Sequence, residues 1–137
     1  MTSSRLYLAG PMRGIPRYNF DSFAEARQRL RDRGFEILCP AERDLASGFD
    51  PIGMTGNEDL EALGFPVAQT LDQCFRDVLD CDGIALLPGW ARSEGARAET
   101  LIAHLSGREI FEYHAHRPQI LEPLADRAVL TRVEVLR

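Results

Sequence analysis

Long apolar runs are missing from this sequence: none of its hydrophobic stretches approaches the roughly 20 residues that a membrane-spanning helix needs. The first ten residues, MTSSRLYLAG, contain one Arg and a short apolar stretch that breaks at Gly10 and Pro11. The pattern of a secretory signal peptide is therefore missing as well. These absences predict a protein that has no membrane partner and stays in the cytoplasm.

Cysteine and basic charge are also scarce. The three cysteines, an odd number, lack the pairing of a zinc ribbon and are expected to be reduced thiols; they are Cys39, Cys74 and Cys81. With 16 basic against 21 acidic residues, the net charge of -5 repels a polyanion and argues against long nucleic acids as partners. His114 and His116 lack a third ligand, so no metal is predicted, and no cofactor is expected.

What the sequence does contain is an alternation of strand and helix patterns. Its 137 residues, 45% of them hydrophobic, suit one domain over residues 1–137. A continuous apolar run over 5–10 predicts a strand buried on both faces, 21–35 has helical spacing, and 36–40 is a second short strand. Asn19 or Asp21 is the expected cap of this helix and Gly34 its end. The pattern is that of a right-handed βαβ unit.

The second half repeats the alternation after a segment, residues 41–68, with no readable pattern, which predicts a functional lid or a flexible loop. A helix is expected over 68–81, a strand over 83–88, and a helix that begins near Ser93, stops at Gly107 and leads into a short strand. The tail, 113–137, is expected to hold a short helix and a strand. Apolar side chains predicted to face the core from these helices are Leu71, Cys74, Phe75 and Val78 in the first, and Ala98, Leu101, Ile102 and Leu105 in the second. The alternation predicts an α/β fold with a doubly wound, mainly parallel sheet.

In such a sheet ligands gather beyond the carboxyl ends of the strands, and two of the loops there are unusual. In the second loop, Ser93 fits a helix N-cap, which leaves the amides of Gly95 and Ala96 pointing beyond the helix end. Such an end favours an anion, and Arg13 of the first loop can close on the same anion. The alternative is a plain capping serine without a ligand.

Glu99 stands four residues after Gly95, in a helical stripe of very small side chains. Neither Arg97 nor His104 lies at the i+3 or i+4 spacing that would pair with it on a helix. A carboxylate that is at least half-buried near an anion-binding helix end is a candidate nucleophile or base. We expect it to face a hollow of the size of a sugar.

The segments LYLAGPMRG, YNFDSF, CPAE and DGIALLPGWARSEGARAE resemble a phage and bacterial family of small proteins. That family is related to the nucleoside 2-deoxyribosyltransferases and the 2'-deoxynucleoside 5'-monophosphate N-glycosidases, and the resemblance covers residues 5–112. It implies a Rossmann-like (flavodoxin-like) domain in which a tyrosine, an aspartate and a glutamate surround a deoxyribose. Tyr7 matches the tyrosine, Ser93 and Glu99 keep the six-residue interval to the nucleophile, and Arg13 matches a phosphate-binding arginine. Gly10, Gly95 and Trp90, the last as an aromatic wall for the base, complete the expected substrate site.

Two positions depart from the family pattern. Pro11 stands where the glycosidases carry a phosphate-binding serine, which counts against a monophosphate substrate. Cys74 stands where the family aspartate belongs, with Asp72 and Asp77 on either side of it. We favour Asp72 as the second catalytic carboxylate, because Asp77 fits a role in supporting the end of its helix.

Three functions compete at this point. The first is an enzyme that cleaves or transfers the N-glycosidic bond of a deoxyribonucleotide or deoxyribonucleoside through Glu99, with Tyr7 orienting Glu99 and a second acid protonating the base. The second is a module that binds or senses a nucleotide without turnover, and the third is an interaction protein that has lost its ligand. The resemblance also implies a homo-oligomer, with the tail after residue 113 as a contact.

Overall fold

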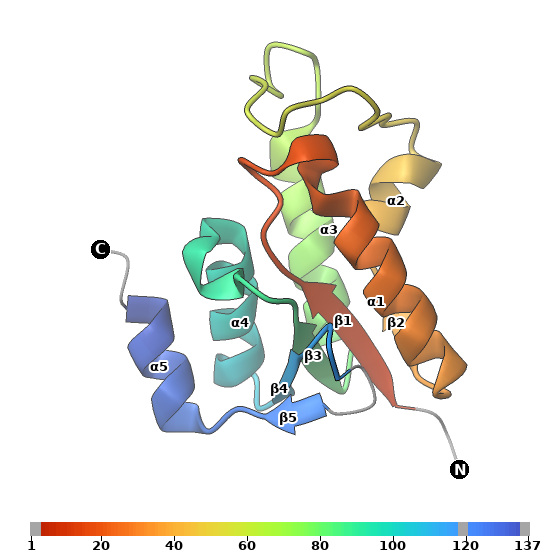
Figure 1. Ribbon diagram of the computed structural model, residues 1–137. Helices are drawn as coiled ribbons and strands as arrows, with labels where there is room; N and C mark the ends of the chain where they lie inside the picture. Colours follow the sequence, from red (N-terminus) through yellow and green to blue (C-terminus); the bar gives the residue numbers. More distant parts are fainter. Residues whose placement is uncertain (1–3, 118–120, 135–137) are drawn as a thin grey trace.

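The computed structural model describes residues 4–117 and 121–134. Its centre is a five-stranded sheet in the order β2-β1-β3-β4-β5 (Figure 1). Four strands are parallel, and β5 pairs antiparallel with β4. This order is flavodoxin-like, with its switch point between β1 and β3, and it confirms the predicted α/β, doubly wound sheet. The strands are β1 (Arg5–Ala9), β2 (Glu36–Leu38), β3 (Gly83–Leu86), β4 (Glu109–Tyr113) and β5 (Leu121–Pro123).

Helices cover the sheet on both sides (Figure 1). Helix α1 lies on one face, and α3 and α4 lie on the other. No helix within the described residues is both long and apolar enough to cross a bilayer. The helices are α1 (Phe20–Asp32), α2 (Pro40–Ala46), α3 (Val67–Leu79), α4 (Glu94–Leu105) and α5 (Asp126–Glu134), with 3-10 turns η1 (Pro16–Asn19) and η2 (Trp90–Arg92).

Strand β1 shows why its sequence is continuously apolar. Leu6 and Leu8 are buried in the cluster with α1, whereas Tyr7 and Ala9 belong to the cluster with α3 and α4. Because successive side chains of a strand point to opposite faces, a strand covered on both sides has no position for a polar residue that lacks a partner. Within residues 6–9, the one polar side-chain group is the hydroxyl of Tyr7, and it is placed on the α3 and α4 face.

The ends of α1 confirm one expectation and change another. Gly34, with a φ of 94°, follows the C-cap residue Arg33 and ends the helix as predicted. Asn19 occupies the N-cap position, but its side chain does not cap the helix. Its Nδ2 instead donates to the carbonyl oxygen of Pro11 at 2.9 Å, which ties the loop after β1 to the start of α1.

The predicted inner faces of the next two helices were partly wrong. Leu71 of α3 is 43% exposed, and Leu105 of α4 is 74% exposed. The buried face of α4 consists of Ala96, Glu99, Thr100 and Ala103. The stripe expected from the sequence and the stripe that is buried both have helical spacing, so periodicity alone does not show which of them faces the core. Small side chains allow a helix to approach a sheet closely, and the stripe with two buried alanines is the one that packs.

The segment over 41–68, which has no readable sequence pattern, starts with a helix and continues as a docked loop. Helix α2 begins with Pro40 at its first position, where proline is favoured. Residues 47–66 then pass over the carboxyl end of the sheet (Figure 1). The amide of Gly14 donates to the oxygen of Gly56 at 3.0 Å, and that of Arg17 donates to the oxygen of Met54 at 2.9 Å. The tail contains the expected strand and helix, β5 and α5.

Candidate active site

The centre of the candidate site is a buried pair formed by Tyr7 of β1 and Glu99 of α4. Tyr7 is fully buried, and Glu99 is 9% exposed. The hydroxyl of Tyr7 donates a hydrogen bond to Oε2 of Glu99. The two residues are 92 positions apart in the chain, and the α/β crossover brings them together beneath the start of α4. The structure therefore places both predicted residues in one cluster.

Burial controls the protonation of this pair. Removal from water raises the pKa of Glu99 to about 8, although the hydrogen bond from Tyr7 acts in the opposite direction. Burial also raises the pKa of Tyr7 well above its ordinary value, and the negative charge of Glu99 adds to this effect. A carboxyl group with a pKa of about 8 can take up or release a proton not far from neutral pH, as a general acid or base does.

Cys74 of α3 adjoins this pair, at the position where the resemblance expects an aspartate. Burial raises the pKa of its thiol to about 12, and the charge of Glu99 is the next cause. A thiol with so high a pKa remains protonated at neutral pH and is a weak nucleophile. Cys74 therefore contributes a small buried wall beside Glu99 rather than a second charge.

The two candidate aspartates of α3 are placed contrary to the preference from the sequence. Asp72 is exposed and forms a surface ion pair with Arg76 at 3.1 Å. Two residues along a helix turn the side chain about 200°, so Asp72 lies on the face opposite Cys74. Asp77, three residues from Cys74, is on the buried face at 2% exposure.

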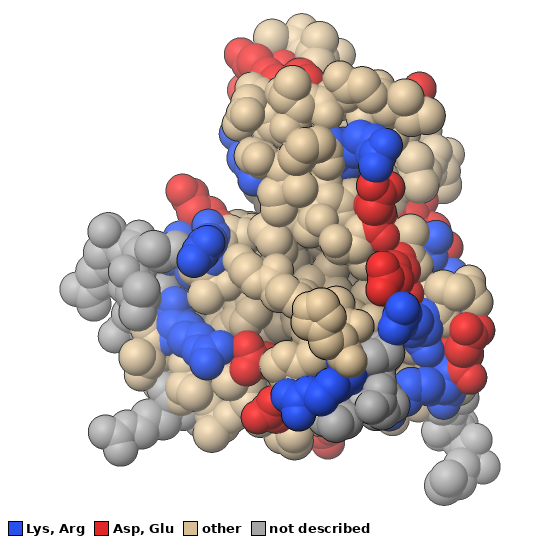
Figure 2. Space-filling view, viewed as in Figure 1, with Lys and Arg blue, Asp and Glu red and all other residues tan. Residues whose placement is uncertain are grey.

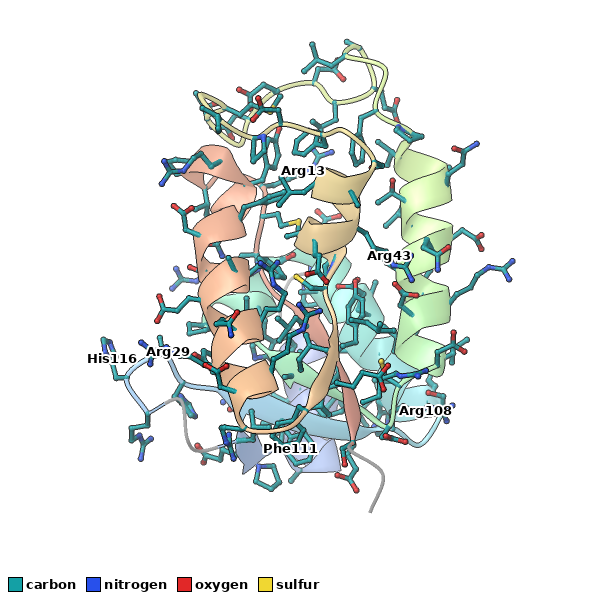
Figure 3. The ribbon with its side chains drawn as sticks, turned by 90° about the vertical axis from the view of Figure 1, so that its right-hand side faces the viewer. Arg13, Arg29, Arg43, Arg108, Phe111 and His116 are labelled. Carbon is teal, nitrogen blue, oxygen red and sulfur yellow. The ribbon has the colours of Figure 1, made fainter. Side chains whose placement is uncertain are left out.

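Asp77 is fully engaged within the protein. Its two carboxylate oxygens accept hydrogen bonds from Nε and Nη2 of Arg43 at 2.5 and 2.8 Å. Gln73 adds a third bond at 3.0 Å. Figure 3 shows Arg43 reaching from α2 toward α3. This bidentate ion pair joins the two helices, so Asp77 supports the structure, although not in the helix-end role expected from the sequence.

Asp44 of α2 is a further candidate acid, which sequence reasoning missed. It is half-buried, and burial raises the pKa of its carboxyl to about 6. It interacts electrostatically with Cys74 and therefore lies near the Glu99 cluster. No side chain among the described residues bonds to its carboxylate. The signal that could have found it is Pro40, since a proline after a strand marks the start of a helix on which Asp44 lies one turn in.

The start of α4 has an ordinary N-cap, formed by the side chain of Ser93. Oγ of Ser93 accepts a hydrogen bond from the amide of Ala96 at 3.2 Å, so one of the two amides expected to meet an anion already has a partner. Gly95 is exposed, and a Cβ placed there would meet only Oγ of Ser93, at 4.0 Å. The backbone at Gly95 therefore remains open to an incoming group.

The loop after β1 combines a packing constraint with a free charge. A Cβ on Gly10 would lie 2.7 Å from Cβ of Leu87, so glycine allows this loop to contact the end of β3. Arg13 is exposed and forms no ion pair with the described residues. Its charge acts on Tyr18 of η1, and Figure 3 shows its place among the loops at the carboxyl end of the sheet. Gly10 is thus explained by packing, and Arg13 is available to a ligand.

The expected hollow next to Glu99 is not among the two cavities that the structure describes. One, of about 390 Å³, lies at the amino ends of the strands and includes Leu6, Phe35 and Phe111 in its wall. The other, of about 360 Å³, lies at the carboxyl ends of β3 and β4 and includes Trp90. Neither is lined by Glu99 or Tyr7. Trp90 is buried, and its Nε1 donates to Glu112 at 3.2 Å. It lines the cavity at the carboxyl ends of β3 and β4 rather than the hollow that was expected next to Glu99.

The fold and the buried tyrosine–glutamate pair define an α/β protein of flavodoxin-like topology with a candidate catalytic carboxylate at the switch-point side of the sheet. The chain belongs to the family described as "Domain of unknown function (DUF4406)", whose model matches residues 4–112. Among solved structures it is similar to a 2-deoxyribosyltransferase from the psychrotolerant bacterium Bacillus psychrosaccharolyticus, with a TM-score of 0.55 and 19% sequence identity over 80% of this chain and 72% of that one. No match is found among curated proteins.

Proposed function

We propose that this protein cleaves or transfers the N-glycosidic bond of a deoxyribonucleoside or its 5'-monophosphate, with Glu99 as the nucleophile. The observation that carries the proposal is the buried hydrogen bond between Tyr7 and Glu99. Support also comes from the likeness of the fold to a 2-deoxyribosyltransferase, an enzyme that acts on such bonds. The sequence contains no lysine, so no lysine side chain is available as an alternative nucleophile.

In this mechanism the carboxylate of Glu99 attacks the anomeric carbon while the bond to the base breaks. The transition state resembles an oxocarbenium ion, whose positive charge a buried carboxylate stabilises. The bond that forms is an ester between Glu99 and the sugar, and the leaving base takes up a proton. Water or a second base then attacks the same carbon and gives up a proton to the acid that protonated the leaving base, which releases Glu99 and completes hydrolysis or transfer.

The proton for the leaving base requires an acid, and we assign this role to Asp44 in place of Asp72. The carboxyl of Asp44 is half-buried, has a raised pKa of about 6 and is unpaired among the described residues. Asp72 is exposed and paired with Arg76 on the far face of α3. Arg13, Gly10, Ser93 and Gly95 form the remaining candidate contacts, with Arg13 free to meet a phosphate. The homo-oligomer expected from the resemblance remains part of this proposal, and the mass of the protein in solution tests it.

Chromatography of reactions with a panel of deoxynucleosides and their 5'-monophosphates tests the proposal, since it detects the released or exchanged base. Glu99→Gln is expected to reduce turnover to background, and Asp44→Asn to reduce it by about 10²- to 10⁴-fold, as loss of a general acid does. Asp72→Asn, an equal change of charge on an exposed position, is expected to retain activity. Undiminished turnover in a folded Glu99→Gln variant would refute the assignment.

A non-catalytic nucleotide-binding or nucleotide-sensing module is the second candidate. Two observations favour it: Cys74 occupies the position of the expected acid, and Glu99 lines neither described cavity. Calorimetric titration with the same compounds distinguishes the two functions. Tight binding with no product after long incubation supports the sensing module, and released base supports the enzyme.

A further inference from the structure

The cavity at the carboxyl ends of β3 and β4 has neither Tyr7 nor Glu99 in its lining, and it has the features of a ligand site. Its volume of about 360 Å³ falls within the range of roughly 300–1,000 Å³ common for small-molecule pockets. One wall comes from the end of β3 and from η2, and the other from the end of β4 and from α5. Apolar groups of Leu86, Pro88 and Ala91 lie beside a few charged ones, the usual composition of such a pocket.

The charges in this cavity are mainly positive. The guanidinium groups of Arg92 and Arg132 line it, against the single carboxylate of Glu112. Basic side chains also gather over α4 and α5 on the left of Figure 2. This excess is local, because the chain as a whole has a net charge of -5. All 16 of its basic residues are arginines, whose planar guanidinium groups suit phosphate.

The hydrogen-bond partners of these side chains show which positive charge lacks a paired carboxylate among the described residues. Oε2 of Glu112 accepts hydrogen bonds from Nη1 of Arg132 at 2.7 Å and from Nε1 of Trp90 at 3.2 Å, so this carboxylate is held in place. His114 contacts Glu122 at 2.9 Å. Arg92 is exposed, and no carboxylate of the described residues pairs with it. Among the described residues, no acceptor lies opposite its guanidinium or the remaining N–H groups of Arg132.

We infer that this cavity is a binding site for a small molecule that carries a phosphate group. Two guanidinium groups on one cavity match the geometry and the double negative charge of a phosphate monoester. The apolar wall is suited to the uncharged body of the molecule. The inference does not depend on the proposed function, because the cavity shares no residue with the Tyr7–Glu99 pair.

Trp90 provides a direct reading of occupancy, since it is the chain's one tryptophan and lies in the cavity wall. Ribose 5-phosphate and inorganic phosphate are titrated into the full chain at constant ionic strength, with unphosphorylated ribose as the neutral comparison. A saturable change in tryptophan fluorescence with the phosphorylated probes alone is expected. Its absence, or an equal change with ribose, overturns the inference.

Variants then locate the bound phosphate. Arg92→Gln is expected to raise Kd about tenfold or more, in line with the loss of one charge-assisted hydrogen-bonding group. Glu112→Gln removes the opposing charge and is expected to lower Kd several-fold. Arg76→Gln makes the same charge change as Arg92→Gln on the exposed surface of α3 and is expected to leave Kd within about twofold. Equal effects of Arg92→Gln and Arg76→Gln, or weaker binding by Glu112→Gln, overturn the site.

The same titration with Arg13→Gln separates this cavity from the proposed active site. Unchanged binding in Arg13→Gln with weakened binding in Arg92→Gln supports two distinct sites. If Arg13→Gln abolishes the signal and Arg92→Gln does not, the phosphate binds at the loop after β1, and the inference fails.

Discussion

At the scale of single residues, the position of Glu99 and its contact with Tyr7 could be predicted, whereas the depth of its burial could not. The lack of helical partners pointed to Glu99, the family resemblance added the interval from Ser93, and the structure places Glu99 against Tyr7. The sequence did not reveal that Glu99 lies on the most buried face of α4, because the neighbouring apolar stripe has the same period. Asp44 was not identified from the sequence for a related reason: Pro40 marks the start of its helix, but the burial of Asp44 depends on how α2 packs against its neighbours.

The hydrogen bond from Tyr7 to Glu99 makes a testable contribution to the reaction. This bond lowers the pKa of Glu99 against the larger effect of burial. Tyr7→Phe removes it, so the pKa of Glu99 should rise by roughly 0.4–1 unit, the equivalent of one net hydrogen bond. Because the nucleophile must be ionised, the rise of kcat/KM with pH should shift to higher pH by the same amount. The measurement is the pH profile of base release.

Tyr113→Phe is the matched control for this shift. Tyr113 is also buried, and its hydroxyl has no hydrogen-bond partner in the part of the chain that the structure describes. Its loss is expected to leave the midpoint of the profile in place. A Tyr7→Phe profile with an unmoved midpoint, or one moved to lower pH, contradicts the role assigned to this bond.

At the scale of elements, the segment over 47–66 is the part that the sequence described least. Its structure comes from tertiary contacts rather than from periodic packing. Glu58 accepts hydrogen bonds from the amides of Thr55 and Gly56 at 2.9 and 3.0 Å, and the loop after β1 binds the same turn. On the other side of this junction, Arg17, Tyr18 and Asn19 all have positive φ, a conformation that costs roughly 1–2 kcal/mol for residues such as Arg17 and Tyr18 and less for asparagine. Two irregular segments thus hold each other in position above the sheet.

Gly56 is the point at which this junction can be tested. A Cβ there would overlap the carbonyl oxygen of Ile15 and lie 2.7 Å from its amide nitrogen, and the φ of Gly56 is 95°. Gly56→Ala should therefore lower the free energy of unfolding by about 2–5 kcal/mol, from overpacking and left-handed strain together. Gly53→Ala, with a φ of 81° and nothing within 4 Å of its Cβ, isolates the strain and should cost about 1–2 kcal/mol. Urea denaturation measures both, and equal losses would show that the junction does not restrain the loop.

At the scale of the whole molecule, the alternation of elements was enough to predict a doubly wound, mainly parallel sheet. Buried strands such as β1 have to be apolar on both faces, and this constraint is visible in the sequence. The antiparallel direction of β5 was not predictable, because its three residues have no period of their own. The cavity beside Trp90 was not predictable either, because it forms only where η2, β4 and α5 come together.

The buried acids give the folded molecule an unusual dependence on pH. Glu99 has a folded pKa of about 8 against an ordinary value of 4.5. Its contribution to stability is complete below the ordinary value, because both states then hold the proton. Between these two values only the folded state retains it, so the free energy of unfolding falls by about 1.4 kcal/mol for each pH unit per proton. Asp44, raised from 3.8 to about 6, acts in the same direction at lower pH.

Glu99→Gln should remove the larger of these two slopes. Glutamine fills the same volume without ionising, so the variant gains stability relative to the unaltered chain as pH rises, by about 1.4 kcal/mol per unit from roughly pH 5 to pH 8. Glu94→Gln, at an exposed position on the same helix, should shift the curve by less than about 1 kcal/mol and leave its slope unchanged. Urea denaturation across this range measures the difference. Parallel curves for the unaltered chain and Glu99→Gln would mean that Glu99 ionises in the fold as easily as in water, and that its burial does not prepare it for catalysis.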